Sequence, residues 1–360
     1  MTQPFWQDKK VFLTGHTGFK GSWLALWLQS MGAEVIGFSL PAPTHPSLFE
    51  LTDVASGMTC ITGDIRDLDA LSQAMHKHHP DVVIHMAAQS LVRESYQSPV
   101  ETYATNVMGT VHTMEAVRRT PSVRVALNVT TDKCYENREW HWGYRENDRL
   151  GGHDPYANSK ACSELVTMSY WNSFLLNQSI SVATARAGNV IGGGDWAKDR
   201  LIPDIIQAFM NNQPAVIRNP DAVRPWQHVL EPLSGYLLLI EKLWQDEQSY
   251  AEAWNFGPLA QDAQPVGWIA DRLTDAWGSN VRWMKDDGYH PHESTILRLD
   301  CSKAYNRLGW EASLPLVTAL DWIVEWYHAY QAGGDLRTLT LAQISRFESL
   351  QQINEKALPI

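Results

Sequence analysis

The sequence predicts an α/β fold built on a doubly wound parallel sheet, with a smaller mixed α/β lobe toward the C-terminus. Short apolar segments rich in β-forming residues alternate with helical segments over the first half of the chain, and a glycine-rich turn directly follows the first apolar segment. After residue 188, glycine and proline become frequent and the periodicity weakens. Near-continuous apolar strands that alternate with helices are typical of a parallel sheet covered on both faces.

The individual elements follow in order from this alternation. The glycine turn is followed by an apolar segment that we expect to be helical, because Gly32 provides a natural C-terminal stop. We expect strands at 10–14, 34–39, 58–62, 81–86, 123–129 and 180–186, and helices at 21–31, 68–78, 100–119 and 156–176.

Composition excludes several classes of protein. The chain has 360 residues and a net charge of −11, from 29 basic and 40 acidic residues. No basic run offers a face for nucleic acid, no uncharged apolar stretch is long enough to span a bilayer, and the N-terminus lacks the apolar core of a signal peptide. We therefore expect a cytoplasmic protein without nucleic-acid or membrane partners. The cysteines have neither paired nor zinc-binding spacing, which predicts reduced thiols and no metal site: Cys60, Cys134, Cys162 and Cys301.

A glycine-rich turn joins the first expected strand to the first expected helix. Gly15, Gly18 and Gly21 are spaced three residues apart, and Thr17 and Phe19 lie between them. Glycine permits a tight turn in which backbone amides approach a pyrophosphate, and the helix N-terminus adds unpaired N–H groups. The turn therefore predicts a Rossmann-type domain that binds a dinucleotide through these residues.

The choice of dinucleotide depends on the end of the second expected strand. Many NAD-binding proteins carry a carboxylate there for the ribose 2′-hydroxyl, whereas this chain has Ser39. A serine can donate to a hydroxyl or to a phosphate, so we expect NAD and do not exclude NADP. After the third strand, Asp64 and the adjacent Ile65 are expected beside the adenine, with Asp64 accepting from the adenine amino group.

Two domains are expected from the change in texture along the chain. The NAD-binding domain should comprise residues 1–188 and about 223–256. The substrate domain should comprise residues 189–222 and 257–360.

A tyrosine and a lysine four residues apart predict redox chemistry. Tyr156 and Lys160 share one face if their segment is helical. A free tyrosine has a pKa near 10, and a cation about 4 Å away in a partly screened site favours the phenolate by roughly 4 kcal/mol. We therefore expect Tyr156 to act as a base on a substrate hydroxyl while a hydride leaves for the cofactor.

In combination, these motifs resemble those of extended short-chain dehydrogenases/reductases that modify nucleotide sugars. The resemblance covers nearly the whole chain. It is carried by TGHTGFKG at 14–21, GDIRD at 63–67, HMAAQS at 85–90, NVMGT at 106–110, NVTTDKCY at 128–135, YANSK at 156–160 and RAGNVIGGGDW at 186–196.

The resemblance implies roles for further residues. Thr131 matches the catalytic serine or threonine of the family, which hydrogen-bonds the reacting hydroxyl. Asn106 matches an active-site asparagine that holds a water or the helix backbone near the lysine. Ala87 and Ala88 match residues that pack beside the cofactor.

The two residues after Thr131 distinguish subfamilies. Nucleotide-sugar 4,6-dehydratases commonly carry an Asp-Glu pair there and epimerases lack it, whereas this chain has Asp132 and Lys133. That pair is similar to the dehydratases that act on CDP-linked glucose. The resemblance implies a CDP-glucose substrate, hydride transfer from C4 to NAD and back to C6, and Asp132 as the acid at the C6 hydroxyl. Lys133 is expected either to remove the C5 proton or to stabilise the enolate.

Residues for the nucleotide are expected mainly in the second lobe. Asn189 matches the family position that binds the substrate diphosphate, and Arg218 and Arg224 offer planar guanidinium groups to phosphate oxygens. Arg93, after the fourth strand, is expected to face sugar or cofactor. A looser match to residues that close the nucleotide pocket in relatives covers His290, His292, Glu293 and Arg298.

Alternative functions remain open on the sequence. A 4,6-dehydratase or a 4-epimerase for a UDP- or dTDP-linked sugar would use the same fold, although the Asp-Lys pair disfavours the epimerase. A reductase would consume its cofactor stoichiometrically, and a cofactor-binding regulatory protein would not turn over a sugar nucleotide. By analogy with relatives we expect a homodimer or a tetramer, paired through the helices at 100–119 and 156–176.

Overall fold

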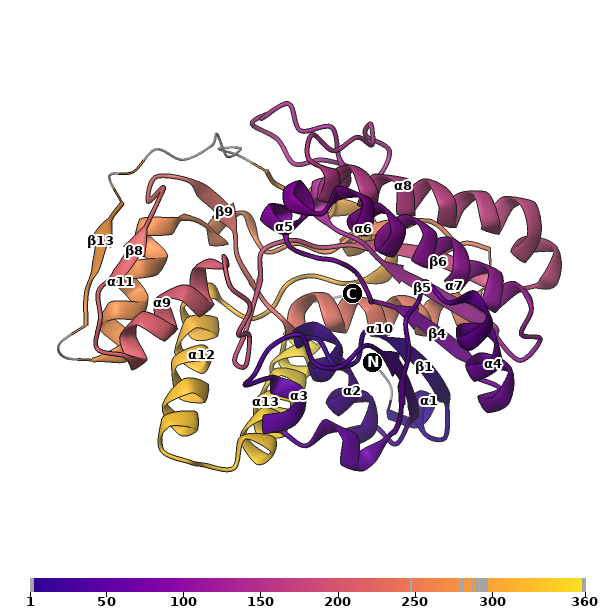
Figure 1. Cartoon of the computed structure of the whole chain (residues 1–360), viewed down its shortest axis with the longest axis horizontal. Helices are drawn as coiled ribbons and strands as arrows, with labels where there is room; N and C mark the ends of the chain where they lie inside the picture. The colour runs from indigo at the N-terminus through magenta and orange to yellow at the C-terminus, as the bar shows by residue number, and fades with distance from the viewer. Residues whose placement is uncertain (1–2, 247, 279–280, 287, 289–296, 358–360) are drawn as a thin grey trace.

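A seven-stranded parallel sheet forms the larger lobe of the molecule (Figure 1). The computed structural model describes residues 3–246, 248–278, 281–286, 288 and 297–357. The strand order is β11-β6-β5-β4-β1-β2-β3, and every pair in it is parallel. The strands are β1 Lys10–Thr14, β2 Glu34–Ser39, β3 Thr59–Thr62, β4 Val82–His85, β5 Val125–Val129, β6 Ser181–Arg186 and β11 Ala253–Asn255.

The expected strands are all present in this sheet, which confirms the predicted fold class. One strand was missed: β11 lies at the sheet edge and pairs with β6. Three residues are too few to show a periodic pattern, so it is the pairing with β6 that makes this segment a strand.

Helices cover both faces of the sheet. On β1, Val11 and Leu13 point into the core beneath α2 and α10, and Phe12 points into the opposite core beneath α4 and α7. This alternation follows from the two-residue period of a strand, and it makes each strand apolar on both sides. The helices of this lobe are α1 Gln3–Trp6, α2 Phe19–Ser30, α3 Leu48–Leu51, α4 Leu68–His78, α5 Val92–Gln97, α6 Pro99–Tyr103, α7 Gly109–Arg118, α8 Pro155–Tyr170 and α10 Leu230–Gln245.

The smaller lobe lies beyond the C-terminal ends of the sheet strands (Figure 1). Its short strands pair β13 with β8 and β12 with β9. Helix α13, Leu336–Ala357, contacts both α12 and α2, and Trp27 of α2 packs edge-on against Phe347. The last helix therefore links the two predicted domains. The remaining elements are β7 Val190–Ile191, α9 Leu201–Met210, β8 Ala215–Ile217, β9 Val223–Pro225, β10 Gln227–His228, β12 Ala263–Pro265, α11 Val266–Trp277, β13 Trp283–Lys285 and α12 Leu316–Gln331.

Candidate active site

A cleft of about 2520 Å³ lies at the C-terminal ends of the sheet strands, between the two lobes. The predicted site residues come together in its lining, with one exception, Asn106, which is buried behind it. His290, His292 and Glu293 lie outside the described residues. The predicted residues that line the cleft are Gly15, Thr17, Gly18, Phe19, Gly21, Ser39, Asp64, Ile65, Ala87, Ala88, Arg93, Thr131, Asp132, Lys133, Tyr156, Lys160, Asn189, Arg218 and Arg224.

The glycine turn has the geometry of an anion cradle. Gly15 has φ +78°, a left-handed conformation that favours glycine. A Cβ on Gly21 would lie 2.1 Å from the Gly15 carbonyl oxygen. The N-cap residue of α2, Gly18, provides no side-chain hydrogen bond to the first turn. The amides at this helix N-terminus therefore lack a side-chain partner and fit a dinucleotide pyrophosphate.

Substitution of Gly21 by alanine is expected to weaken dinucleotide binding by roughly tenfold or more, because the added Cβ must displace the Gly15 carbonyl. Titration of the protein's tryptophan fluorescence with NAD measures the change. In Gly18→Ala the nearest protein atom to the new Cβ is 3.4 Å away, so this variant keeps the loop geometry and isolates contact with the ligand. Full affinity in Gly21→Ala would contradict the assigned role of the turn.

Two hydroxyls meet at the end of β2. Thr17 Oγ1 and Ser39 Oγ are 2.8 Å apart, and Thr17 Oγ1 also lies 2.9 Å from the Leu40 carbonyl oxygen, to which it can donate. Ser39 thus stands where a ribose would be recognised. At the end of β3, Asp64 accepts hydrogen bonds from the backbone and guanidinium of Arg66, which hold the pKa of Asp64 below its usual value.

The tyrosine–lysine pair lies on the first turns of α8. Helix α8 is capped by Asp154, which accepts from the backbone N–H of Ala157 at 2.8 Å. Burial raises the pKa of Tyr156 to about 12, and burial lowers the pKa of Lys160 to about 8. Lys160 Nζ donates to the Val129 carbonyl oxygen at 3.1 Å. The phenolate that we expected from Lys160 is therefore not favoured in this structure, because loss of hydration outweighs the attraction of the cation.

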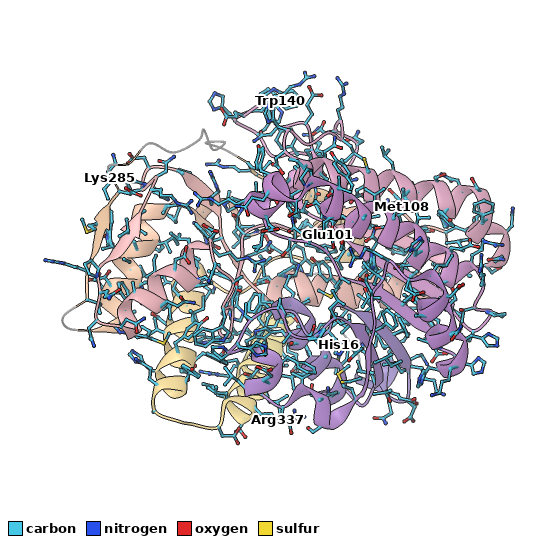
Figure 2. All side chains as sticks on the ribbon, in the orientation of Figure 1. His16, Glu101, Met108, Trp140, Lys285 and Arg337 are labelled. Atoms are coloured by element: carbon cyan, nitrogen blue, oxygen red, sulfur yellow. The ribbon has the colours of Figure 1, made fainter. Side chains whose placement is uncertain are left out.

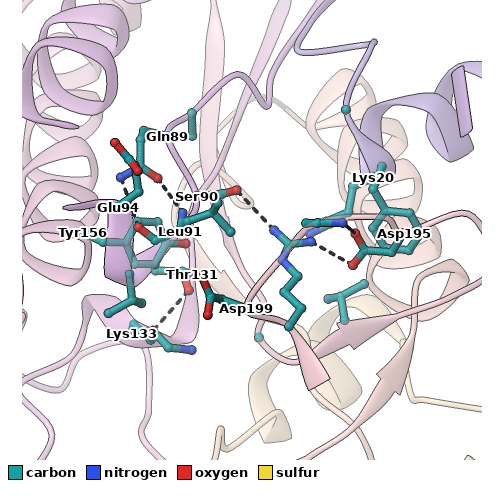
Figure 3. Close-up of a pocket in the computed structure, with 18 of the residues that line it drawn as sticks. Lys20, Gln89, Ser90, Leu91, Glu94, Thr131, Lys133, Tyr156, Asp195 and Asp199 are labelled. Carbon is teal, nitrogen blue, oxygen red and sulfur yellow. Dashed lines mark hydrogen bonds and ion pairs between the residues drawn. The ribbon is translucent and has the colours of Figure 1, made fainter. Parts of the chain in front are cut away.

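Thr131, Asp132 and Lys133 form a compact group opposite Tyr156 (Figure 3). Thr131 Oγ1 donates to Asp132 Oδ1 at 3.0 Å and accepts from the backbone N–H of Lys133 at 3.3 Å. Lys133 Nζ lies 3.8 Å from Asp132 Oδ1, and its side chain is partly exposed whereas Asp132 is buried. A carboxyl group and an ammonium group are thus presented beside the reacting tyrosine.

Asn106 supports the site from behind. Its side chain lies in a π-helical turn, accepts from the backbone N–H of Gln89 and donates to the Gln89 carbonyl and to Ser159 Oγ, each at 2.9 Å. Ser159 immediately precedes Lys160 in the chain. Asn106 therefore fixes a cleft loop to the helix that carries the lysine.

A buried ion pair anchors both ends of the loop that carries Thr131, Asp132 and Lys133. Glu164, on α8, accepts from Thr130, from Thr184 at 2.6 Å and from two guanidinium nitrogens of Arg186 at 2.8 and 3.0 Å. Arg186 in turn donates to the Tyr135 hydroxyl at 2.7 Å. Since Thr130 and Tyr135 flank the loop, this ion pair connects the loop to the helix that bears Tyr156.

Two cations in the cleft were not predicted. Lys20 Nζ donates to the Tyr236 hydroxyl at 2.9 Å, and burial together with nearby positive charges lowers its pKa to about 7. Arg200 pairs with Asp195 at 2.9 Å and donates to Ser90 Oγ at 3.2 Å (Figure 3). A charged residue inside the glycine turn was a usable signal for Lys20. Arg200 had none, because its segment shows no pattern.

The predicted nucleotide-binding residues present donors to the cleft. The side-chain amide nitrogen of Asn189 and one terminal nitrogen of Arg218 are buried and have no hydrogen-bond partner among the described residues. Arg93 pairs with Asp199 at 2.9 Å, and Arg224 donates to the Val223 carbonyl. Buried donors without partners are costly, so Asn189 and Arg218 are suited to an anionic ligand.

Sequence comparisons relate the chain to nucleotide-sugar enzymes. The family model described as GDP-mannose 4,6 dehydratase matches residues 12–321. A CDP-glucose 4,6-dehydratase of Salmonella typhimurium strain LT2 is 52% identical over 350 residues, which cover 96% of this chain and 98% of that protein. A UDP-glucose 4-epimerase of Halalkalibacterium halodurans is 28% identical over 339 residues, 90% of this chain and 97% of that protein.

Solved structures share the fold. A UDP-glucose 4-epimerase of Thermotoga maritima with UDP-glucose superposes with a TM-score of 0.77 at 19% identity, covering 89% of this chain and 99% of that chain. A dTDP-glucose 4,6-dehydratase of Bacillus anthracis strain Ames in complex with NAD has a TM-score of 0.74 at 21% identity, covering 91% and 98%.

Proposed function

Because this chain belongs to the GDP-mannose 4,6-dehydratase family, we propose that it removes water from CDP-D-glucose to form CDP-4-keto-6-deoxy-D-glucose, as an NAD-dependent lyase. One observation carries the proposal. Asp132 and Lys133 directly follow Thr131 in the cleft that holds Tyr156 and Lys160, in a chain 52% identical to a CDP-glucose 4,6-dehydratase.

The first part of the reaction is an oxidation at C4. NAD accepts a hydride from C4 and later returns it to C6, so the cofactor ends unchanged. Tyr156 takes the proton of the C4 hydroxyl, and Thr131 positions that hydroxyl by a hydrogen bond. Lys160 and Asn106 hold the loops around Tyr156 through Val129 and Gln89.

The second part is the loss of water from C5 and C6. A ketone at C4 makes the C5 proton acidic. Asp132 protonates the departing C6 hydroxyl, and Lys133 promotes removal of the C5 proton, either as the base or as a positive charge beside the enolate. Both groups lie on the short loop that follows β5.

Substrate and cofactor are proposed to occupy different parts of the cleft. The glycine turn, Ser39 and the segment around Asp64 hold NAD, with Ala87 and Ala88 beside it. In the small lobe, Asn189, Arg218 and Arg224 bind the diphosphate of the substrate, and Arg93 faces the sugar. Arginine suits phosphate because its planar fork matches two oxygens at once.

Two further points concern assembly and location. Large apolar side chains are exposed on the outer helices, which favours a homodimer; Figure 2 labels one of them, Met108. The patch comprises Val100, Tyr103, Met108, Leu165 and Phe174. None of the helices in the described ranges has the length and apolar character needed to cross a bilayer. We propose a cytoplasmic enzyme of deoxysugar synthesis for surface polysaccharide such as O-antigen.

Incubation with CDP-glucose, UDP-glucose and dTDP-glucose, each with trace NAD or NADP, tests the function. Mass spectrometry follows the loss of water. Dehydration of CDP-glucose alone, with the cofactor unchanged, is the expected result. Dehydration of another sugar nucleotide, or epimerisation without loss of water, would move the assignment to that activity. Stoichiometric accumulation of reduced cofactor would indicate a reductase.

Replacement of Lys133 by alanine is expected to leave the oxidation nearly intact and to slow the elimination by roughly 10²-fold or more, since the group next to Asp132 that promotes loss of the C5 proton is removed. Reduced cofactor should then accumulate during a single turnover, measured by its absorbance. Equal slowing of oxidation and elimination would contradict the assigned role.

A further inference from the structure

Three side chains in the cleft are joined by an unbroken line of hydrogen bonds. The hydroxyl of Tyr156 is hydrogen-bonded to that of Thr131, and Thr131 Oγ1 donates to Asp132 Oδ1 at 3.0 Å. A hydroxyl has one proton to donate, so Tyr156 is the donor toward Thr131. The backbone N–H of Lys133 occupies the other acceptor position of Thr131 at 3.3 Å, as Figure 3 shows. The hydrogen bonds therefore all point from Tyr156 toward Asp132.

The Asp132 end of this line has capacity for a proton. Asp132 is 1% exposed, and its Oδ2 has no hydrogen-bond partner among the described residues. The carboxyl group packs directly on the backbone at Gly188, where a Cβ would lie 1.9 Å from Oδ2. The positive charges facing it are Lys133, 3.8 Å from Oδ1, and more distantly Lys20. These cations favour the carboxylate, so some source must supply the proton that an acid at C6 requires.

We propose that Tyr156, Thr131 and Asp132 form a proton relay that carries the proton of the C4 hydroxyl to Asp132 for use in the elimination. This proposal rests on the proposed function, because it needs an oxidation followed by a loss of water. As the C4 hydroxyl gives its proton to Tyr156, Tyr156 gives its own to Thr131 and Thr131 gives its own to Asp132. At Tyr156 and Thr131 one O–H bond breaks while another forms, and a hydride leaves C4 for NAD, so C4 becomes a carbonyl.

The elimination then resets the relay. The C5 proton goes to the base, its electron pair forms the C5–C6 double bond, and the C6–O bond breaks. Asp132 protonates the departing oxygen and becomes a carboxylate again. The proton of the C4 hydroxyl thus leaves in the water that is lost. The relay also explains how Tyr156 can act although burial raises its pKa to about 12, because no free phenolate has to form.

The test uses CDP-6-deoxyglucose, which has a C4 hydroxyl but no C6 hydroxyl, so the reaction stops after the oxidation. Stopped-flow absorbance records reduced cofactor, and a pH indicator in weak buffer near pH 7 records protons released to solvent. The wild-type protein with NAD is expected to form reduced cofactor with almost no proton release. Asp132→Asn should release about one proton for each reduced cofactor. Asp199→Asn is the matched control, because Asp199 pairs with Arg93 and has no hydrogen bond to Thr131, and it should release none.

A second variant tests the relay with the carboxyl group still present. Gly188→Ala places a Cβ within 1.9 Å of Asp132 Oδ2 and must move the carboxyl group. We expect it to form reduced cofactor and to release a proton, as Asp132→Asn does. A merely structural role for Asp132 would change the rate of oxidation without changing the number of protons released.

Two results would overturn the relay alone: release of a full proton by the wild type, or no release by Asp132→Asn while cofactor is reduced. If the wild type neither reduces the cofactor with this substrate nor dehydrates CDP-glucose, the proposed function falls and the relay falls with it. The proton count and the dehydration assay therefore separate the two failures.

Discussion

In the variant Tyr156→Phe, formation of reduced cofactor from CDP-glucose is expected to fall by about 10³-fold, and formation of the dehydrated product should fall with it. The hydroxyl of Tyr156 is the group that takes the C4 proton, and acid–base groups contribute roughly 10²–10⁴-fold to the rate. Phenylalanine keeps the ring in its buried position on α8, so the fold and the cleft should persist. Rapid-mixing absorbance of reduced cofactor in a single turnover measures the effect.

Tyr103→Phe is the matched control for this loss. Tyr103 also hydrogen-bonds through its hydroxyl, to Asn158 at 3.0 Å, but it is exposed and does not line the cleft. We expect near-normal oxidation in this variant. Near-normal oxidation in Tyr156→Phe as well would show that another group takes the C4 proton and that the relay starts elsewhere.

Glu164→Gln is expected to lower the free energy of unfolding by about 3–5 kcal/mol, the range seen when one partner of a buried ion pair is removed. Glu164 and Arg186 are both almost fully buried, and the amide would leave the Arg186 charge without its counter-ion. Since Glu164 also accepts from Thr130, the loop that carries Asp132 should lose its anchor. Urea unfolding followed by fluorescence measures the stability.

Glu115→Gln serves as the comparison on the protein surface. Glu115 pairs with Arg118 and Arg119 on α7, where the arginine side chains are largely in water. Its loss should cost about 1 kcal/mol or less. Adding Arg186→Met to Glu164→Gln should recover part of the lost stability, because the unpaired charge is then removed. Equal small losses in both single variants would contradict the structural importance of the buried pair.

Much of the fold could be predicted because the signals are local. The six expected strands of the sheet are continuous apolar runs, and the glycine turn has a spacing that only a strand–turn–helix unit uses in this way. The strand β11 was missed because its three residues owe their conformation to β6. Lys20 was missed although it stands inside the glycine turn, since its contact with Tyr236 comes from a distant helix.

The sequence by itself determined which reactive groups this protein possesses: the glycine turn, Thr131 with the Asp-Lys pair, and Tyr156 with Lys160. Local spacing is enough for this, because each motif is complete within a few residues. Only the tertiary structure decided how these groups act. It buries Tyr156 so that its pKa rises rather than falls, turns Lys160 toward Val129, and lines up Tyr156, Thr131 and Asp132 beside Gly188. Desolvation and hydrogen-bond direction depend on residues far apart in the chain, and no local pattern records them.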